Sequence, residues 1–180
     1  MRKIHVLCAL LIVFSTVLTR PSIVSAHSMY QTAVLLDFDG DKVGVELQLP
    51  VDRLSISFKQ TVDEPHFAAE RQQLHDYVLE HVHPVTLDER PFHVEFGDMS
   101  IQTVEKAPYL VVHLILIPPN GASVDHFTLN YDVIAHEIVT HVVLISIRSD
   151  MQHPIPPNDP VLLGMIRWTK KTQDVDRFKR

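Results

Sequence analysis

Two histidines five positions apart, His136 and His141, are the first residues whose types and spacing suggest chemistry. With Glu137 between them they approach the His-Glu-x-x-His pattern of zinc proteases, in which both histidines lie on one helix face. The i, i+5 spacing turns the second imidazole off that face, and in a strand it sends the two rings to opposite sides. The zinc-protease interpretation is therefore rejected. A hairpin between the two histidines would still allow a shared metal site, or a hydrolase site that includes Glu137.

A third candidate metal ligand, His27, follows the expected cleavage site of an export signal. Arg2 and Lys3 precede an apolar run over residues 4–18, and Ala26 offers a small side chain for cleavage. The run is shorter than the ~20 residues that span a membrane, so residues 1–26 are predicted to be a cleaved signal peptide. The new α-amino group and the imidazole of His27 would then chelate one ion together, and nitrogen ligands in a plane suit Cu(II). The alternative is an exposed terminal histidine without a ligand.

Composition excludes several classes of function. The first 26 residues hold three of the 16 basic and none of the 22 acidic residues, so the remaining 154 residues have a net charge of −9. Such an acidic chain is poorly suited to nucleic acid, whose phosphates require a basic surface. The only cysteine, Cys8, leaves with the signal, and no Gly-x-Ser-x-Gly motif or phosphate-binding glycine loop is present. These absences favour a binding module over an enzyme, and the eleven remaining histidines keep metal contact open.

The other histidines also have structural interpretations. His75, His81 and His83 lie on or just after a predicted helix, where imidazoles interact favourably with the helix C-terminus. His113 alternates with apolar residues in a strand, so it is predicted to be a hydrogen-bonded core histidine.

The elements that must position these residues are mostly short strands. Two apolar runs joined by Asp39-Gly40-Asp41 predict a hairpin over residues 31–49. Residues 50–60 alternate apolar and polar side chains and predict a further strand. Apolar residues at three- and four-residue spacing predict one amphipathic helix over residues 65–82, which Asp63 caps and Pro84 ends.

The rest of the chain predicts a sheet-rich domain. Further strands are expected over residues 92–96, 100–104, 109–117, 127–135, 142–147 and 161–168, and residues 154–160 form a rigid loop rich in proline. Many short strands with a single helix predict a mainly β fold, a β-sandwich that is Ig-like or similar with one amphipathic helix inserted. We expect one extracytoplasmic domain over residues 27–168 and a basic C-terminal tail over residues 169–180.

Two stretches carry a resemblance to a known family. Residues 45–54, which read VELQLPVDRL, and residues 127–150, which include His136, His141 and a closing Ser-Asp, are similar to the extracytoplasmic N-terminal domain of HupE/UreJ-type membrane proteins. The segment His27-Ser28-Met29 resembles the start of that domain after its signal. The likeness covers most of residues 27–168.

The resemblance implies an accessory role in hydrogenase or urease systems and a link to nickel. In that family the permease function belongs to transmembrane helices that follow the domain, and no apolar span follows Trp168 here. We therefore expect an exported, non-enzymatic accessory module that contacts a metal, nickel or copper, and a membrane protein or a membrane surface through the basic tail. A copper-binding domain anchored by His27 is the alternative, and a hydrolase is the second alternative.

Overall fold

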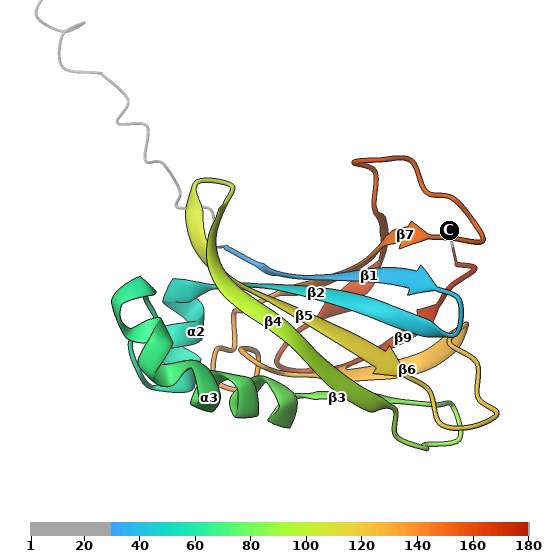
Figure 1. Ribbon diagram of the computed structural model, residues 1–180, viewed down its shortest axis with the longest axis horizontal. Coiled ribbons are helices and arrows are strands. Elements are labelled where there is room, and N and C mark those ends of the chain that lie inside the picture. Colours follow the sequence, from blue (N-terminus) through green and yellow to red (C-terminus); the bar gives the residue numbers. More distant parts are fainter. Residues whose placement is uncertain (1–29, 180) are drawn as a thin grey trace, which may run out of the picture.

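Nine strands form two sheets in the computed structural model, which describes residues 30–179. The larger sheet has six strands in the order β4-β5-β2-β1-β7-β8, and the smaller sheet has the order β3-β6-β9. Figure 1 shows the two helices together at one end of these layers. The fold is mainly β and sandwich-like, as predicted. The strands are β1 (Thr32–Asp39), β2 (Lys42–Pro50), β3 (Val82–Val85), β4 (His93–Val104), β5 (Ala107–Ile117), β6 (His126–Tyr131), β7 (Val143–Asp150), β8 (Val161–Ile166) and β9 (Thr172–Asp176).

The predicted hairpin at the start of the domain is confirmed. Strands β1 and β2 pair antiparallel from Asp39–Lys42 to Ala33–Gln48, and Gly40 in the turn has φ +62. Glycine adopts this left-handed conformation without strain, so the chain can turn at Gly40 from β1 into β2. On its other side β1 runs parallel to β7, so the hairpin lies in the middle of the larger sheet.

Residues 51–58 form a helix, α2 (Val51–Phe58), and the predicted strand at residues 50–60 is wrong. The apolar residues of this segment alternate in the sequence as in a strand, but the buried positions follow the period of a helix. The buried positions are Val51, Leu54 and Ser57, three residues apart, and Ile56 is exposed. Pro50 precedes the helix and Lys59 ends it in the left-handed conformation, φ 62.

The helix predicted over residues 65–82 is present as α3 (Glu64–Glu80). Asp63 has an extended backbone, and its carboxylate accepts a hydrogen bond from the backbone N–H of His66 at 3.0 Å. Proline follows in the first turn, where its missing N–H costs nothing. Leu74 and Val78 are the buried positions. Pro84, which was expected to end the helix, lies within β3 instead.

The cap of α3 gives a direct test of this local structure. Replacing Asp63 by alanine removes an acceptor from the first-turn N–H groups, and we expect the thermal midpoint to fall by roughly 2–4 °C. Circular dichroism against temperature measures the change. Asp159→Ala, in an exposed loop, is the matched control and should leave the midpoint unchanged; equal midpoints for both variants would contradict the role of the cap.

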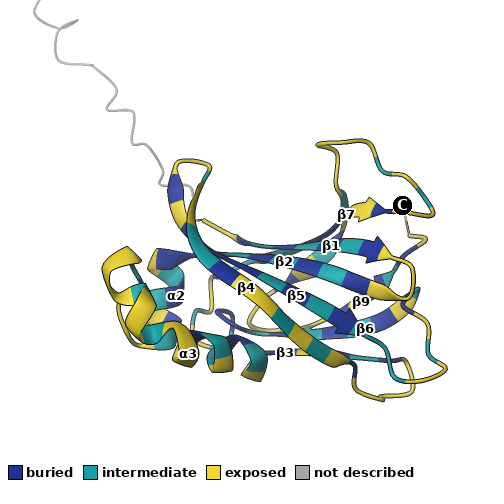
Figure 2. Cartoon of the chain, in the orientation of Figure 1, coloured by how far each residue is buried: buried dark blue, intermediate teal, exposed yellow. Residues whose placement is uncertain are grey.

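The core lies between the sheets and beneath the helices. Alternate residues of the strands are buried, as the stripes in Figure 2 show, and the fully buried side chains include Leu36, Leu47 and Leu114 of the larger sheet and Phe127 of the smaller one. Strand β5, expected in the middle of a sheet, lies between β4 and β2. The two strands expected over residues 92–104 are one strand, β4, with a register shift between Phe96 and Met99.

The segment expected to be a basic tail is part of the fold. Residues 172–176 form β9, which pairs antiparallel with β6, so the boundary predicted at residue 168 is wrong. Two of its basic side chains meet acidic partners within the domain. The ammonium of Lys171 lies 2.8 Å from Asp132. The guanidinium of Arg177 lies 2.6 Å from Asp150, and the side chain of Arg177 is 2% exposed. These two charges are therefore paired within the domain.

No helix among residues 30–179 has the length and apolar character needed to cross a membrane. The predicted signal peptide over residues 1–26 and the candidate ligand His27 lie outside the described residues.

Candidate metal centre

His136 lies in a turn that follows β6, and the strand expected over residues 127–135 ends at Tyr131. The backbone N–H of His136 donates to the carbonyl of Asp132 at 3.1 Å, and that of Ile138 donates to Ile134 at 3.1 Å. These i, i+4 bonds form a helical turn. The turn begins at Asp132, and it places the imidazole of His136 next to the backbone carbonyl of that residue.

Strand register brings His81 to the same place. Val82 of β3 pairs with Tyr131 of β6, so the residues just outside that pair, His81 and Asp132, face each other. The backbone N–H of Asp132 donates to the carbonyl of His81 at 3.2 Å. Residues 51 positions apart thus meet at the end of the smaller sheet, where α3 has just ended.

Asp132 orients both imidazoles. Its carboxylate oxygen Oδ1 lies 2.7 Å from Nδ1 of His81, and its backbone carbonyl lies 2.8 Å from Nδ1 of His136. An ionised carboxylate and a carbonyl only accept hydrogen bonds, so Nδ1 carries the proton in both rings. In the neutral rings, Nε2 then holds a free lone pair. This pattern is typical of histidine metal ligands, whose second ring nitrogen donates to a carboxylate or a carbonyl.

The two rings lie against each other. Their centroids are 4.3 Å apart and their planes differ by 10°. One ligand atom each from His81, Asp132 and His136 can be chosen so that all three lie within 4.8 Å of one another. Ring lone pairs lie in the ring planes, so two stacked imidazoles must turn toward each other to bind one ion. Two imidazole nitrogens are donors that suit zinc, copper or nickel better than magnesium or calcium.

The surroundings of the cluster are partly sheltered from water. The side chains of His81 and Asp132 are 17% and 24% exposed. Tyr77 packs on both rings, with centroids 4.7 Å from His81 and 6.0 Å from His136, and its hydroxyl donates to the carbonyl of Val133 at 2.6 Å. Burial raises the pKa of Tyr77 to about 12, so it stays neutral and supports the rings rather than supplying a charge.

Asp132 is held as an anion. Burial acts to raise its pKa, but hydrogen bonds from Lys171 and His81 outweigh that effect and lower it below the usual value. Lys171 lies 2.8 Å from the carboxylate oxygen Oδ2. The cluster therefore consists of two oriented imidazoles beside the negative charge of Asp132. The ammonium of Lys171 pairs with that charge.

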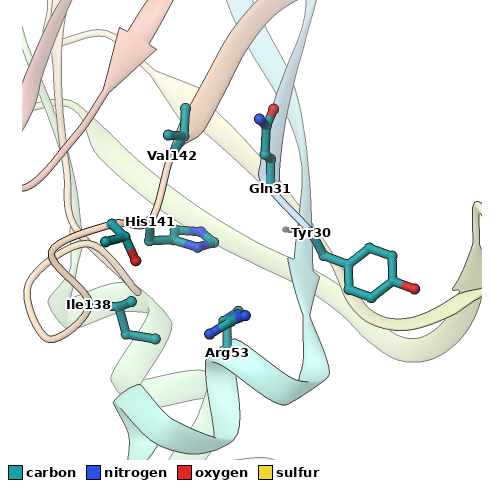
Figure 3. A pocket seen from close by; sticks show the side chains of 7 residues that line it. Tyr30, Gln31, Arg53, Ile138, His141 and Val142 are labelled. Carbon is teal, nitrogen blue, oxygen red and sulfur yellow. The ribbon is translucent and has the colours of Figure 1, made fainter. Parts of the chain in front are cut away.

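His141, the other histidine of the sequence pattern, lies elsewhere. It is 4% exposed, and its Nε2 lies 2.9 Å from the hydroxyl of Thr32 on β1. Figure 3 shows its ring directed toward the start of β1, with Arg53 of α2 beside it. The cavity at this point has a volume of about 20 Å³, room for about one water molecule. Among residues 30–179, His141 is thus buried and bonded to Thr32, and it is not close to His136.

The three side chains of the proposed hydrolase site have different partners. Glu137 pairs with Lys59 at 2.8 Å, His136 stacks on His81, and His141 bonds to Thr32. They do not share a site. His113, expected in the core, instead lies on the outer face of the larger sheet with a half-exposed ring, 2.8 Å from Asp98.

Sequence reasoning identified His136 but missed His81 and Asp132 as its companions. One local signal was available, because Asp132 and His136 stand four residues apart, the spacing of a helical turn. The contribution of His81 depends on the pairing of β3 with β6, which no short motif encodes.

Comparison with known proteins adds no family. The chain matches no protein-family model and no curated protein. The role of the group formed by His81, Asp132 and His136 is therefore inferred from its geometry.

Proposed function

We propose that this protein is an extracytoplasmic, non-enzymatic accessory module that binds a divalent transition-metal ion through His81 and His136, whose rings Asp132 orients. The observation that carries the proposal is the double role of Asp132, whose carboxylate and carbonyl fix the Nδ1 protons of both histidines and leave both Nε2 atoms free. Zinc, copper and nickel are the ions that this donor set suits.

The cellular setting of the proposal comes from the sequence. The export signal predicted over residues 1–26 supports a location outside the cytoplasm. The resemblance of residues 45–54 and 127–150 to HupE/UreJ-type domains supports an accessory role beside a membrane protein of metal homeostasis, with nickel as the ion of that system. A partly sheltered site of two imidazoles fits a protein that receives and passes on an ion.

Calorimetric titration of the purified protein with Zn(II), Ni(II) and Cu(II) tests the site. We expect binding at micromolar concentration that is lost in His81→Ala and in His136→Ala, because each substitution removes one of the two nitrogen ligands. Asp132→Asn should weaken binding by about 10- to 100-fold through the loss of ring orientation.

The matched control is His126→Ala. His126 lies on β6 and pairs with Asp176 at 2.9 Å, so it is also a histidine bonded to a carboxylate in the smaller sheet. It should bind metal like the wild type. Equal affinities for the His81→Ala, His136→Ala and His126→Ala proteins would overturn the site. Loss of Cu(II) binding in His27→Ala alone would instead favour a copper site at His27, the residue predicted to follow the cleaved signal.

A further inference from the structure

The outer face of the larger sheet carries a hollow that neither His81 nor His136 lines. Val34 of β1 and Leu47 of β2 are buried in the core, so their neighbours Ala33 and Gln48 point to the opposite face. These two residues line the outer hollow, whose volume is about 320 Å³. The β4–β5 hairpin also borders it and rises above this face of the sheet in Figure 1. The volume suits a small organic molecule.

Two tyrosines line the outer hollow with hydroxyl groups that are available to a ligand. The rings of Tyr30 and Tyr109 meet edge to face, with centroids 6.2 Å apart and planes 78° apart. Figure 3 shows the side chain of Tyr30 directed away from His141. Tyr109 is only 5% exposed, yet no side-chain hydrogen bond within residues 30–179 engages its hydroxyl or that of Tyr30. A nearly covered tyrosine normally bonds its hydroxyl, so this one lacks its usual partner.

The outer hollow is electrostatically negative. Among the described residues that line it, Glu105 is the only charged one, and no ion pair within residues 30–179 engages its carboxylate. Burial raises the pKa of the Tyr109 hydroxyl, and the charge of Glu105 acts in the same direction, so the carboxylate lies near that hydroxyl. Such surroundings attract a cation and repel an anion.

The backbone that carries Glu105 is strained. Val104 pairs with Ala107, so Glu105 and Lys106 form a two-residue turn between β4 and β5. Both turn residues have left-handed backbone, with φ 50 and φ 73. Turns of this type usually contain asparagine and glycine, because other side chains are strained in this conformation. Such strain is often kept where a side chain has a function, and of the two residues Glu105 lines the outer hollow.

We propose that the outer hollow binds the ammonium group of a primary amine. An ammonium group has three hydrogen-bond donors, which match the carboxylate of Glu105 and the hydroxyl oxygens of Tyr30 and Tyr109. The partly exposed ring of Tyr30 adds the attraction between a cation and an aromatic face. The aliphatic side chains that receive the apolar part of the amine are Ala33, Val104 and Leu144. The proposal goes beyond metal binding and does not depend on it.

Butylammonium and butanol are matched test ligands, because they share an alkyl chain and only the amine is charged at pH 7. Titrations followed by nuclear magnetic resonance should show binding of butylammonium at millimolar concentration, and binding of butanol about tenfold more weakly. Nα-acetyl-lysine methylamide presents the same ammonium on a peptide unit. Tighter binding of this derivative would identify a lysine side chain of a partner as the source of the amine, and tighter binding of butylammonium would identify a free amine.

Substitutions test the two kinds of contact. Glu105→Gln should weaken butylammonium binding about fivefold and leave butanol binding unchanged, because only the charged contact is lost. The matched control is Glu95→Gln, the same change on β4 outside the hollow, which should bind like the wild type. Tyr109→Phe, which lies outside the strained turn, should also weaken butylammonium binding about fivefold through the loss of one hydrogen bond.

Three results would overturn the amine site. They are equal affinities for butylammonium and butanol, equal affinities of the Glu105→Gln and Glu95→Gln proteins for butylammonium, and no binding of either amine at millimolar concentration. Thermal unfolding verifies that the variants are folded. Zn(II) titration of the Glu105→Gln protein reports separately on His81 and His136, so the failure of one site is distinguished from the failure of the other.

Discussion

Replacing Arg177 by methionine should lower the free energy of unfolding by about 3–5 kcal/mol. The guanidinium of Arg177 donates to Asp150 through Nη2 at 2.6 Å and Nε at 2.9 Å, and the two side chains are 2% and 1% exposed. Hydrogen bonds from Arg177 hold the pKa of Asp150 well below its usual range. Without Arg177 the carboxylate stays buried and loses its permanent positive partner, and only the imidazole of His153, 3.3 Å away, can still carry a positive charge beside it. Urea unfolding followed by circular dichroism measures the loss.

Two further variants show whether the loss of stability comes from breaking the buried ion pair. Arg167→Met removes an exposed arginine from the end of β8 and should change stability by less than about 0.5 kcal/mol. The double variant Asp150→Asn with Arg177→Met removes the uncompensated charge and should recover part of the loss, because asparagine still accepts the N–H of Gln152 and His153. If Arg177→Met and Arg167→Met were equally stable, the buried pair would not be holding the C-terminal strand.

Acidification from pH 6.5 to 4 should remove about 3 kcal/mol of stability through His141. Burial, assisted by the positive charge of Arg53, lowers the pKa of His141 from 6.5 to about 4. Between these two values the unfolded chain binds a proton that the folded protein does not. The contribution of His141 to stability is therefore fully present above pH 6.5, decreases as the pH falls, and stops decreasing below pH 4.

The pH profile of His141→Gln separates this effect from that of other groups. Glutamine keeps a polar side chain that can bond to Thr32 but does not titrate, so the free energy of unfolding of this variant should fall less over the same interval. Nuclear magnetic resonance of the wild-type His141 ring should give a titration midpoint of about 4. A midpoint near 6.5 would contradict the prediction, whatever the stability of the variant.

The elements that could be predicted from the sequence are those with a local cause. The turn at Gly40 and the cap at Asp63 depend on the conformational preferences of single residues, and both are present. The helix α2 could not be predicted in this way, because residues 54, 56 and 58 alternate as in a strand. Tertiary packing of Leu54 and Ser57 decided its period instead.

The candidate metal site could be predicted only in part for a related reason. His136 stood out because of its neighbours in sequence, and its pairing with His141 was the natural hypothesis. Its actual companion His81 comes from a distant part of the chain and reaches the site only through the pairing of β3 with β6. His81, Asp132 and Lys171 meet because β3 and β9 lie on opposite sides of β6, and this register is set by packing across the whole smaller sheet.

The parallel pairing of β1 with β7 also bears on how the chain folds. Thr32 meets Val143, and the smaller sheet is completed only by β9 near the end of the chain. A protein with such distant pairings has a high contact order and folds slowly, since the entropy of closing long loops is lost before their contacts form. The edge of β1 that faces β7 has no partner until residues 51–142 and then β7 have been synthesised. Until then the larger sheet cannot be completed, because β7 and β8 join it only through β1.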